Sequence, residues 1–376
     1  MKKINLGMMG GGKGAFIGDA HRIAAKISNA YTIVGGVFNR DFQTNLEFAR
    51  DYGLDTTRIY KDVDDLIKKE TALSATSRMH AVAIVTPNSS HFEMASKLIK
   101  NGFHIICDKP VTITVAEAEE LERLILKHKV TFCLTHTYTG YPMVRQMKRM
   151  IQEGILGDIQ RIDAQYYQGW VNGIIHNKGA KLSTWRLDSS VAGISSCMGD
   201  IGVHAFNLIE YTTNLKITRI LADLNTLKKN NPMDLDGTIL LRFDGNFRGV
   251  IRASQIATGE ENNVRIAIYG SKGGLKWGQE NPNYLYFISD DKPIQVYKPS
   301  HEYNSAFAEA SHVLPPGHPE GIYEAFGNLY KGAAKAIRGL PLDDGEFPGI
   351  ADGIRGMKFI EGAVKSNRQG NIWVDL

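Results

Sequence analysis

The fold is decided close to the start of the chain, by the stretch Ile4-Asn5-Leu6-Gly7-Met8-Met9-Gly10-Gly11-Gly12-Lys13-Gly14-Ala15-Phe16-Ile17-Gly18. Residues 4–9 form a short apolar run typical of a buried strand, and residues 15–28 place Ala and Ile at helical spacing. The glycines between them let the backbone approach a pyrophosphate, whose charge then lies at the first amides of the helix. The order of strand, glycine turn and helix therefore predicts a unit that binds a dinucleotide.

The glycine spacing within this turn leaves one position open. Gly10 and Gly12 supply the first two small residues of a dinucleotide fingerprint, and the third is either Ala15 or Gly18. A merely flexible turn is the alternative, but the place directly after a strand favours binding. We expect the cofactor to contact Gly10, Gly12, Gly14, Ala15, Phe16 and Ile17.

Strands and helices are expected to alternate over residues 1–136. Capping boxes at Ser90-His91-Phe92-Glu93 and Thr114-Val115-Ala116-Glu117 mark the starts of two helices. The alternation predicts an α/β Rossmann domain with a doubly wound parallel sheet. Further apolar runs, short enough for strands buried on both faces, lie at residues 31–38, 80–86, 103–107 and 130–135.

The pattern changes in the rest of the chain, which we expect to form a second, α+β domain over residues 137–376. Asp244-Gly245-Asn246 is typical of a hairpin turn and indicates antiparallel pairing of the runs that flank it. Residues 322–337 have a helical pattern, and residues 301–320 are expected to form a long loop. The strand-like runs of this part lie at residues 238–243, 248–254, 264–269, 284–287 and 294–297.

Composition excludes several classes of protein. Of the 376 residues 43% are hydrophobic and 22% charged, as in ordinary globular domains. The 44 Lys and Arg against 40 Asp and Glu leave a net charge of +4, which is too small to predict binding to nucleic acid. Cys107, Cys133 and Cys197 lie far apart, which argues against a disulfide framework and favours a reducing cytoplasm. No run approaches the roughly 20 apolar residues of a membrane helix, so we expect a cytoplasmic protein that binds no membrane.

Polar residues follow the second apolar run, at the edge of a parallel sheet where ligands bind. Asn39 can hydrogen-bond ribose hydroxyls, and Arg40 can pair with a 2′-phosphate or stack on adenine. Two solvated turn residues are the alternative, and the acidic residue usual at this point is displaced to Asp41. We expect the cofactor to be NAD, with NADP not excluded.

Two further segments are expected at the same edge of the sheet. Thr86-Pro87-Asn88 with His91 and Asp108-Lys109-Pro110 each follow an apolar run. A lysine directly after a buried strand is costly unless it is solvated or paired, because burial penalises the ammonium. A turn with a helix cap and a surface ion pair are the alternatives to binding. The residues expected to contact the cofactor here are Thr86, Pro87, Asn88, His91, Asp108 and Lys109.

The segment Gly199-Asp200-Ile201-Gly202-Val203-His204 begins an amphipathic run. Because Asp200 and His204 are four residues apart, a helix places the carboxylate and the imidazole on one face. A structural Asp/His pair is the alternative to a catalytic one. Two ligands with no third in view do not make a metal site, so no metal is expected.

Together these segments resemble the Gfo/Idh/MocA family, which includes glucose–fructose oxidoreductase and inositol dehydrogenase. The resemblance rests on the glycine loop, Thr86-Pro87-Asn88 with His91, Asp108-Lys109-Pro110 in place of the family's Glu-Lys-Pro motif, and residues 199–204. It implies that Lys109, Asp200 and His204 are catalytic. It also implies a second domain with an open, mostly antiparallel sheet that mediates oligomers, so we expect a homo-oligomer, either a dimer or a tetramer.

Finer features resemble members of the family that act on inositols and on pyranosides such as levoglucosan or other glucosides. They are the glycine loop, residues 135–142, Trp185-Arg186 and residues 317–321. His136 stands where the family pattern leads us to expect Asn. The likeness implies that the sugar or polyol contacts Lys109, His136, Tyr138, Trp185, Arg186, Asp200, His204 and His318.

The expected reaction is NAD(P)-dependent oxidation of a secondary hydroxyl of a cyclic polyol or pyranoside to a ketone, in a cleft between the two domains. An ordinary histidine has a pKa of about 6.5 and a lysine of about 10.4, so His204 is the favoured base and Lys109 would hydrogen-bond the oxygen. Asp200 would bind a neighbouring hydroxyl or orient the imidazole. The reverse roles of Lys109 and His204 stay open, as do a redox-neutral glycoside-processing enzyme with tightly bound NAD and a non-catalytic sensor of dinucleotide and sugar.

Overall fold

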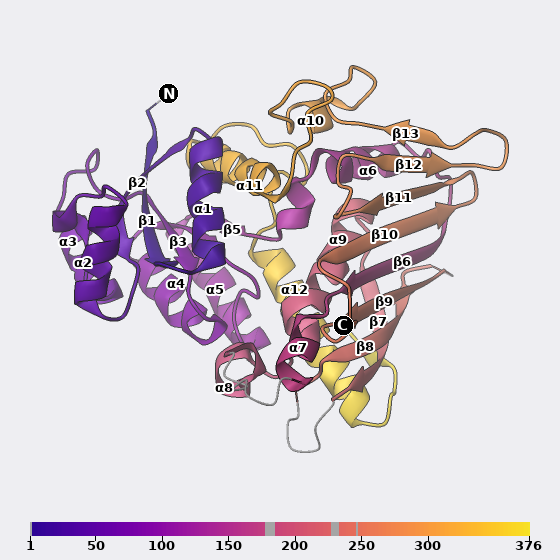
Figure 1. Ribbon diagram of the computed structural model, residues 1–376, viewed down its shortest axis with the longest axis horizontal. Helices are drawn as coiled ribbons and strands as arrows, with labels where there is room; N and C mark the ends of the chain where they lie inside the picture. Colours follow the sequence, from indigo (N-terminus) through magenta and orange to yellow (C-terminus); the bar gives the residue numbers. More distant parts are fainter. Residues whose placement is uncertain (1, 177–184, 227–232, 246) are drawn as a thin grey trace. The chain divides into compact units, whose positions relative to one another are not determined.

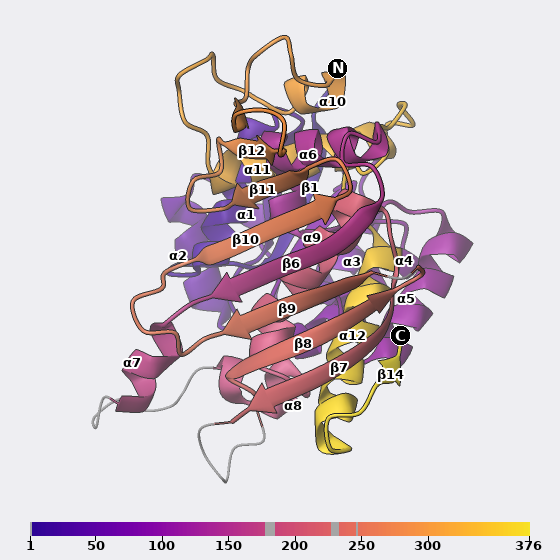
Figure 2. The same ribbon diagram turned by 90° about the vertical axis from the view of Figure 1, so that its right-hand side faces the viewer.

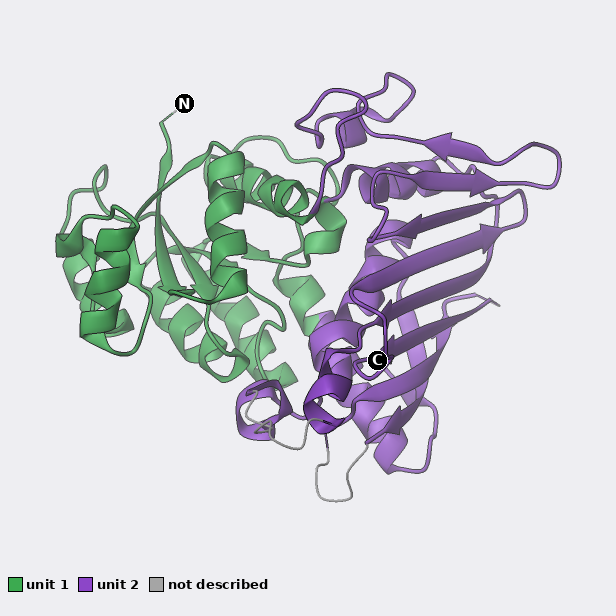
Figure 3. Cartoon of the chain, viewed as in Figure 1, with its two compact units in different colours: residues 1–140, 322–354 green, residues 141–321, 355–376 purple. Residues whose placement is uncertain are grey.

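The computed structural model describes residues 2–176, 185–226, 233–245 and 247–376, and it divides the chain into two compact units (Figure 1, Figure 3). Unit 1 comprises Met1–Gly140 and Ile322–Ile354, and unit 2 comprises Tyr141–Gly321 and Arg355–Leu376. The sequence predicts two domains that are each continuous in the chain and meet at residue 136. In the structure unit 1 also contains a later segment, Ile322–Ile354. No helix in the described parts of the chain is long and apolar enough to cross a membrane.

Unit 1 is built on a five-stranded parallel sheet in the order β2-β1-β3-β4-β5, which confirms the predicted doubly wound sheet. The strands are β1 (Ile4–Gly10), β2 (Tyr31–Val37), β3 (Ala81–Val85), β4 (His104–Cys107) and β5 (Phe132–Leu134). The helices are α1 (Phe16–Ile27), α2 (Phe42–Asp51), α3 (Val63–Thr71), α4 (His91–Lys100), α5 (Val115–His128) and α11 (Ile322–Ile337), with the 3-10 helices η1 (Thr56–Arg58), η2 (Asn88–Ser90) and η3 (Thr137–Gly140). Every residue of β3 is buried, which explains its continuous apolar sequence.

Helix α11 belongs to unit 1 because its apolar face packs on α1. Phe326 and Tyr330 are buried in the same core as Leu6 of β1. A Cβ on Gly327 would lie 2.9 Å from Ile27 Cγ2, so the glycine lets the two helices approach closely. The helix predicted over residues 322–337 is confirmed with the same bounds.

The two predicted capping boxes have different outcomes. Thr114 caps α5, with its Oγ1 accepting a hydrogen bond from Glu117 N at 3.2 Å. The side chain of Ser90 makes no such bond to α4. Its hydroxyl donates to Pro87 O at 2.8 Å instead, because Ser90 closes the preceding 3-10 turn η2.

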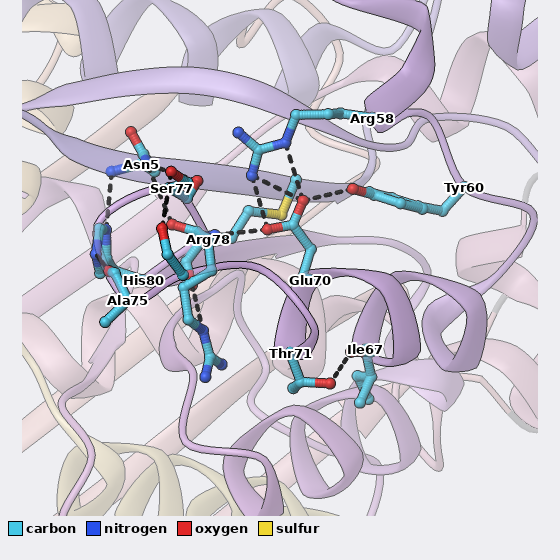
Figure 4. A network of polar contacts seen from close by, with 12 residues as sticks. Asn5, Arg58, Tyr60, Ile67, Glu70, Thr71, Ala75, Ser77, Arg78 and His80 are labelled. Atoms are coloured by element: carbon cyan, nitrogen blue, oxygen red, sulfur yellow. Dashed lines mark hydrogen bonds and ion pairs between the residues drawn. The ribbon is translucent and has the colours of Figure 1, made fainter.

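A polar network around Glu70 joins α3 to the segments that precede and follow it (Figure 4). The fully buried carboxylate of Glu70 accepts hydrogen bonds from Arg58 Nη2 at 2.7 Å, from the hydroxyl of Tyr60 and from Met79 N at 2.6 Å. Burial and the charge of Glu70 raise the pKa of Tyr60, while the Arg58 charge opposes that shift. The network thereby binds the segment before α3 and the segment after it to one carboxylate.

Unit 2 is built on a nine-stranded sheet in the order β13-β12-β11-β10-β6-β9-β8-β7-β14. All neighbours are antiparallel except β6 and β9, which are parallel, so the predicted, mostly antiparallel sheet is confirmed. The strands are β6 (Ile159–Tyr167), β7 (Ile217–Asn225), β8 (Asp236–Phe243), β9 (Arg248–Ser254), β10 (Asn263–Gly270), β11 (Gly274–Gly278), β12 (Leu285–Ile288), β13 (Gln295–Tyr297) and β14 (Val374–Asp375). The helical segments are α6 (Pro142–Gln152), α7 (Trp170–His176), η4 (Trp185–Leu187), α8 (Ser189–Ala192), the π-helical turn η5 (Met198–Gly202), α9 (Val203–Thr213) and α10 (Ala306–Glu309). The chain passes from unit 1 into unit 2 within a further helix, α12 (Ile350–Arg368).

Helix α9 packs against β6 and β10 of this sheet and against α6, and all of its residues are buried. Figure 2 views the sheet from the face that α9 does not cover. Four arginines face one another on adjacent strands of that face: Arg219 of β7 pairs with Arg242 of β8, Arg242 with Arg248 of β9, and Arg248 with Arg161 of β6. The sequence predicts an amphipathic helix, whereas in the structure its polar residues, such as Asn207 and Glu210, are buried as well.

Candidate functional site

There is no room for a side chain at Gly12, in the turn between β1 and α1, or at Gly18, in the first turn of α1. A Cβ on Gly12 would lie 2.6 Å from Phe38 O, and a Cβ on Gly18 would lie 2.3 Å from Gly11 O. Of the two candidates for the third small residue, Gly18 is the one whose missing side chain lets the turn lie directly against α1. The first turn of α1 has no side-chain cap, so its amides fit a pyrophosphate.

The other residues predicted to contact the cofactor in this turn differ in exposure. Gly10 and Gly14 have φ values of +84° and +80°, which favour glycine. Ala15 is the N-cap of α1, and Ile17 is half-buried. Phe16 is 64% exposed, so its ring is open to solvent or to a ligand in the described structure.

Arg22 of α1 supports the same turn, although sequence reasoning did not single it out. Its buried guanidinium donates a hydrogen bond to Gly11 O. The guanidinium also lies over the rings of Phe48 and Tyr52, at 5.0 and 5.2 Å from their centroids. Because Gly11 adjoins the two fingerprint glycines, Arg22 holds the backbone that would face the dinucleotide.

Asn39 and Arg40, at the end of β2, are both exposed. Buried Asn45 fixes this end by accepting a hydrogen bond from Phe38 N and donating one to Tyr60 O, each at 2.9 Å. Asp41 caps α2 through a hydrogen bond from Thr44 N at 2.7 Å, and its bonds to Thr44 lower its pKa. Asp41 therefore caps α2, so Asn39 and Arg40 are the polar residues at this end of β2 that could contact the adenosine ribose.

His91 joins the two turns that the sequence placed at the carboxyl edge of the sheet. Its ring is buried and hydrogen-bonds Thr86 O through Nε2 at 2.8 Å and Pro110 O through Nδ1 at 2.9 Å. Asn88 is buried, whereas Thr86 and Pro87 are half-buried. The imidazole thus acts on both turns through their backbones and holds the segment after β3 against the segment after β4.

Asp108, Lys109 and His136 follow the neighbouring strands β4 and β5. Asp108 Oδ1 accepts hydrogen bonds from Thr135 Oγ1 and from Lys109 N, each at 3.0 Å. Burial, together with the positive charge of Lys109, lowers the pKa of His136 from 6.5 to about 3. His136 is therefore neutral near pH 7, which keeps a second positive charge away from Lys109.

Asp200 and His204 lie on consecutive helical turns of unit 2. The expected regular helix is wrong at its start, because Asp200 belongs to the π-helical turn η5 and His204 to the first turn of α9. Such π turns occur frequently at functional sites. The His204 ring lies 6.0 Å from the ring of Tyr166, between their centroids. Among the described residues, no group of three His, Cys, Asp or Glu side chains gathers as a metal site would require.

Arg186 and Gln255 both reach the carboxylate of Asp200. Arg186 Nε lies 3.4 Å from Asp200 Oδ2, and Gln255 Nε2 donates a hydrogen bond to the same oxygen at 3.0 Å. The guanidinium of Arg186 lies over the ring of Trp185, with Cζ 4.6 Å from the ring centroid. The structure therefore brings Arg186 to Asp200, and it places Gln255 at the same carboxylate oxygen.

Asp234 is a further residue that sequence reasoning missed. Its buried carboxylate accepts hydrogen bonds from Ser196 N at 2.9 Å and from Met198 N at 2.8 Å, at the start of η5. Burial raises its pKa, and these hydrogen bonds oppose the shift. In the sequence Asp234 appears only as an aspartate before a strand, and nothing near it in the sequence indicates that it binds the start of η5.

Tyr138 and His318 are the remaining predicted substrate contacts. Tyr138 lies buried in η3 of unit 1. His318 is exposed in the loop of unit 2 that ends at buried Glu320, whose Oε1 accepts a hydrogen bond from Leu314 N at 2.6 Å. Lys109, His136 and Tyr138 thus belong to unit 1, and the other predicted substrate contacts belong to unit 2.

Known families and proteins match the chain over most of its length. The family description "Oxidoreductase family, NAD-binding Rossmann fold" matches residues 4–136, and "GFO/IDH/MocA C-terminal domain" matches residues 144–276. The uncharacterized oxidoreductase YfiI of Bacillus subtilis is 30% identical, over 100% of this chain and 97% of its own.

Two further relatives carry named substrates or ligands. A levoglucosan dehydrogenase of Pseudarthrobacter phenanthrenivorans is 25% identical, over 100% of this chain and 99% of its own. Crystal structures of an inositol dehydrogenase homolog from Azotobacter vinelandii are 29% identical and cover 100% of this chain and 98% of theirs. The TM-score is 0.93 for the complex with NAD+ and 0.90 for the complex with NADH and myo-inositol.

Proposed function

Because the chain belongs to the Gfo/Idh/MocA family of NAD-binding oxidoreductases, we propose that it oxidises a secondary hydroxyl of a cyclic polyol or pyranoside to a ketone. The substrate would be an inositol, or a glucoside that is oxidised at C3. The observation that carries this proposal is the placement of Asp200 and His204 on consecutive turns of η5 and α9. The relatives named for inositol and levoglucosan support the substrate class.

In this proposal His204 takes the proton of the reacting hydroxyl. Lys109 donates a hydrogen bond to the same oxygen and stabilises the negative charge that develops on it. Asp200 binds a neighbouring hydroxyl or orients the imidazole of His204. NAD, when bound, accepts the hydride from the carbon that carries the hydroxyl. The reverse division, with Lys109 as the base, is the competing assignment.

The cofactor proposed for this reaction is NAD. The glycine turn and the uncapped start of α1 suit the pyrophosphate that NAD and NADP share. Exposed Arg40 is the group that would pair with a 2′-phosphate. Initial rates with each cofactor decide the preference, and an Arg40→Ala variant should lower kcat/KM with NADP more than with NAD.

Single-turnover kinetics test the catalytic roles. Reduction of NAD is followed across pH 5–10 with myo-inositol and with levoglucosan, for wild type, Lys109→Met and His204→Ala. Both variants should be slower, and the acid limb of the profile should disappear in His204→Ala if His204 is the base. Lys100→Met and His128→Ala replace residues away from the proposed site and serve as controls. Near-normal rates of both test variants at every pH would contradict the proposal.

A further inference from the structure

Gln255 is a buried amide directly after β9, and its backbone is held on both sides. Its side chain and backbone have no exposed surface. Gln255 N donates to Leu235 O at 2.8 Å, and its carbonyl accepts from Val171 N at 3.2 Å. The amide therefore projects toward η5 from a backbone that is itself fixed.

The orientation of this amide follows from its two partners. Nε2 donates to Asp200 Oδ2 at 3.0 Å, and Oε1 accepts from Ser196 Oγ at 3.1 Å. An ionised carboxylate can only accept hydrogen bonds, so the NH2 end must face Asp200. The hydroxyl of Ser196 must then donate to the oxygen end. Both ends of the Gln255 side chain are consequently specified.

Ser196 is fixed in turn by the start of the π-helical turn. Its backbone N–H donates to Asp234 Oδ1 at 2.9 Å, and the other oxygen of Asp234 accepts from Met198 N at 2.8 Å. A chain of hydrogen bonds therefore runs from the buried carboxylate of Asp234 through Ser196 and Gln255 to Asp200. All of its members lie in unit 2.

The contact of Arg186 with Asp200 is a weaker constraint than the hydrogen bond from Gln255. Arg186 Nε lies 3.4 Å from Asp200 Oδ2, and its side chain is 39% exposed. An ion pair with that exposure is screened by solvent and restricts the side chains little. A shorter hydrogen bond from a fully buried donor restricts the carboxylate more.

We propose that Gln255 is a positioning residue for Asp200, which holds carboxylate oxygen Oδ2 so that Asp200 meets a substrate hydroxyl in one fixed orientation. This role rests on the function proposed above, in which Asp200 acts on the substrate. Because Gln255 has no exposed surface, it would act on the substrate only through Asp200. Its removal should therefore impair turnover while the affinity for NAD stays unchanged.

The pH dependence of kcat/KM for the Gln255→Glu variant tests this proposal. A protonated Glu can donate to Asp200 Oδ2 as the amide does, whereas an ionised Glu places two carboxylates face to face. The ratio of kcat/KM for Gln255→Glu to that for wild type, measured with myo-inositol and levoglucosan, should rise about tenfold or more from pH 9 to pH 5. Gln255→Leu should lose about tenfold to hundredfold at every pH.

Gln146→Glu is the matched control. Gln146 is also a buried glutamine of unit 2, and its Oε1 accepts a hydrogen bond from Ser305 N at 2.7 Å. The ratio of kcat/KM for Gln146→Glu to that for wild type should not change with pH. A flat ratio for Gln255→Glu, or wild-type turnover by Gln255→Leu, would overturn the role of Gln255. NAD affinity, measured by quenching of protein fluorescence, reports whether each variant is folded.

A measurement without turnover separates this proposal from the proposed function. A double-mutant cycle of Gln255→Leu and Asp200→Ala should show a coupling of about tenfold or more in the unfolding equilibrium constant. If neither substrate is oxidised by wild type, the proposed function fails, and the cycle alone decides whether Gln255 holds Asp200. A coupling below about twofold would then refute the contact.

Discussion

Acid should destabilise unit 1 through His21, a histidine of α1 that is buried completely. Its Nδ1 forms a 2.7 Å hydrogen bond with the hydroxyl of Tyr330 of α11. Burial lowers the pKa of His21 from 6.5 to about 4, and the charge of Asp108 partly opposes this shift. The folded protein therefore holds the ring neutral at a pH where the unfolded chain would protonate it.

The sign and size of the effect follow from these two pKa values. The unfolded chain binds more protons below pH 6.5, so the contribution of His21 to stability is complete above that pH and is lost as the pH falls toward about 4. Each pH unit in this range is worth about 1.4 kcal/mol. At pH 5 the protein should thus have lost about 2 kcal/mol through this residue, out of about 3 kcal/mol in all.

Urea unfolding at pH 7.5 and pH 5.0, followed by circular dichroism, measures the loss. His21→Asn is the informative variant, because an Asn side chain can replace Nδ1 in the bond to Tyr330 but does not titrate. The difference in unfolding free energy between the two pH values should be about 2 kcal/mol smaller in His21→Asn than in wild type. The control His318→Asn changes an exposed histidine and should leave the difference unchanged.

Two results would refute this reasoning. One is an equal pH dependence of stability in wild type and His21→Asn. The other is an NMR titration in which the His21 ring, assigned by its absence from the variant, takes up its proton near pH 6.5.

Three further changes test other parts of the chain. Glu70→Gln should lower the free energy of unfolding by about 3 kcal/mol, because it leaves the Arg58 guanidinium without its buried carboxylate. Unfolding in urea at pH 7 measures this loss, and a loss below about 1 kcal/mol would contradict the explanation. Arg248→Thr should raise stability by about 0.5 kcal/mol at low salt but not in 1 M NaCl, because it removes one of the like charges that face each other across the strands. Arg265→Thr, whose cross-strand neighbours are uncharged, is the control, and an equal gain there would contradict the explanation. Gly18→Ala should weaken NAD binding about tenfold by calorimetry, since the added Cβ would lie 2.3 Å from Gly11 O; unchanged affinity would show that the turn adjusts without cost.

The inner strands of unit 1 could be predicted because both of their faces are buried. β3 appears in the sequence as an unbroken apolar run, and its boundaries were found within one residue. β6, at the centre of the second sheet, was missed. Its buried Ile162, Ala164 and Tyr166 alternate with more exposed residues, since only one face of that sheet is covered. A search for alternation would have found β6, whereas a search for continuous apolar runs could not.

Other features depend on contacts that no local pattern contains. The sequence of α11 predicts an amphipathic helix with the correct bounds, but the pattern does not show that α1 is its partner. The π-helical turn that carries Asp200 is a similar example. Its start is held by Asp234, 36 positions away from Met198 along the chain. The spacing of Asp200 and His204 is equally compatible with a regular helix, so the extra residue in the turn could not be inferred.

Buried polar side chains supply the positional information that the motifs lack. Asn45 fixes the end of β2 next to Asn39, and His91 joins the turns after β3 and β4. Gln255 holds Asp200 by the same principle. Each of these side chains bonds two groups of the chain at once, and leaving either group unpaired in the interior would cost free energy. The motif residues can therefore be recognised from the sequence, while the geometry in which they act is determined by amide and imidazole groups that have no signature of their own.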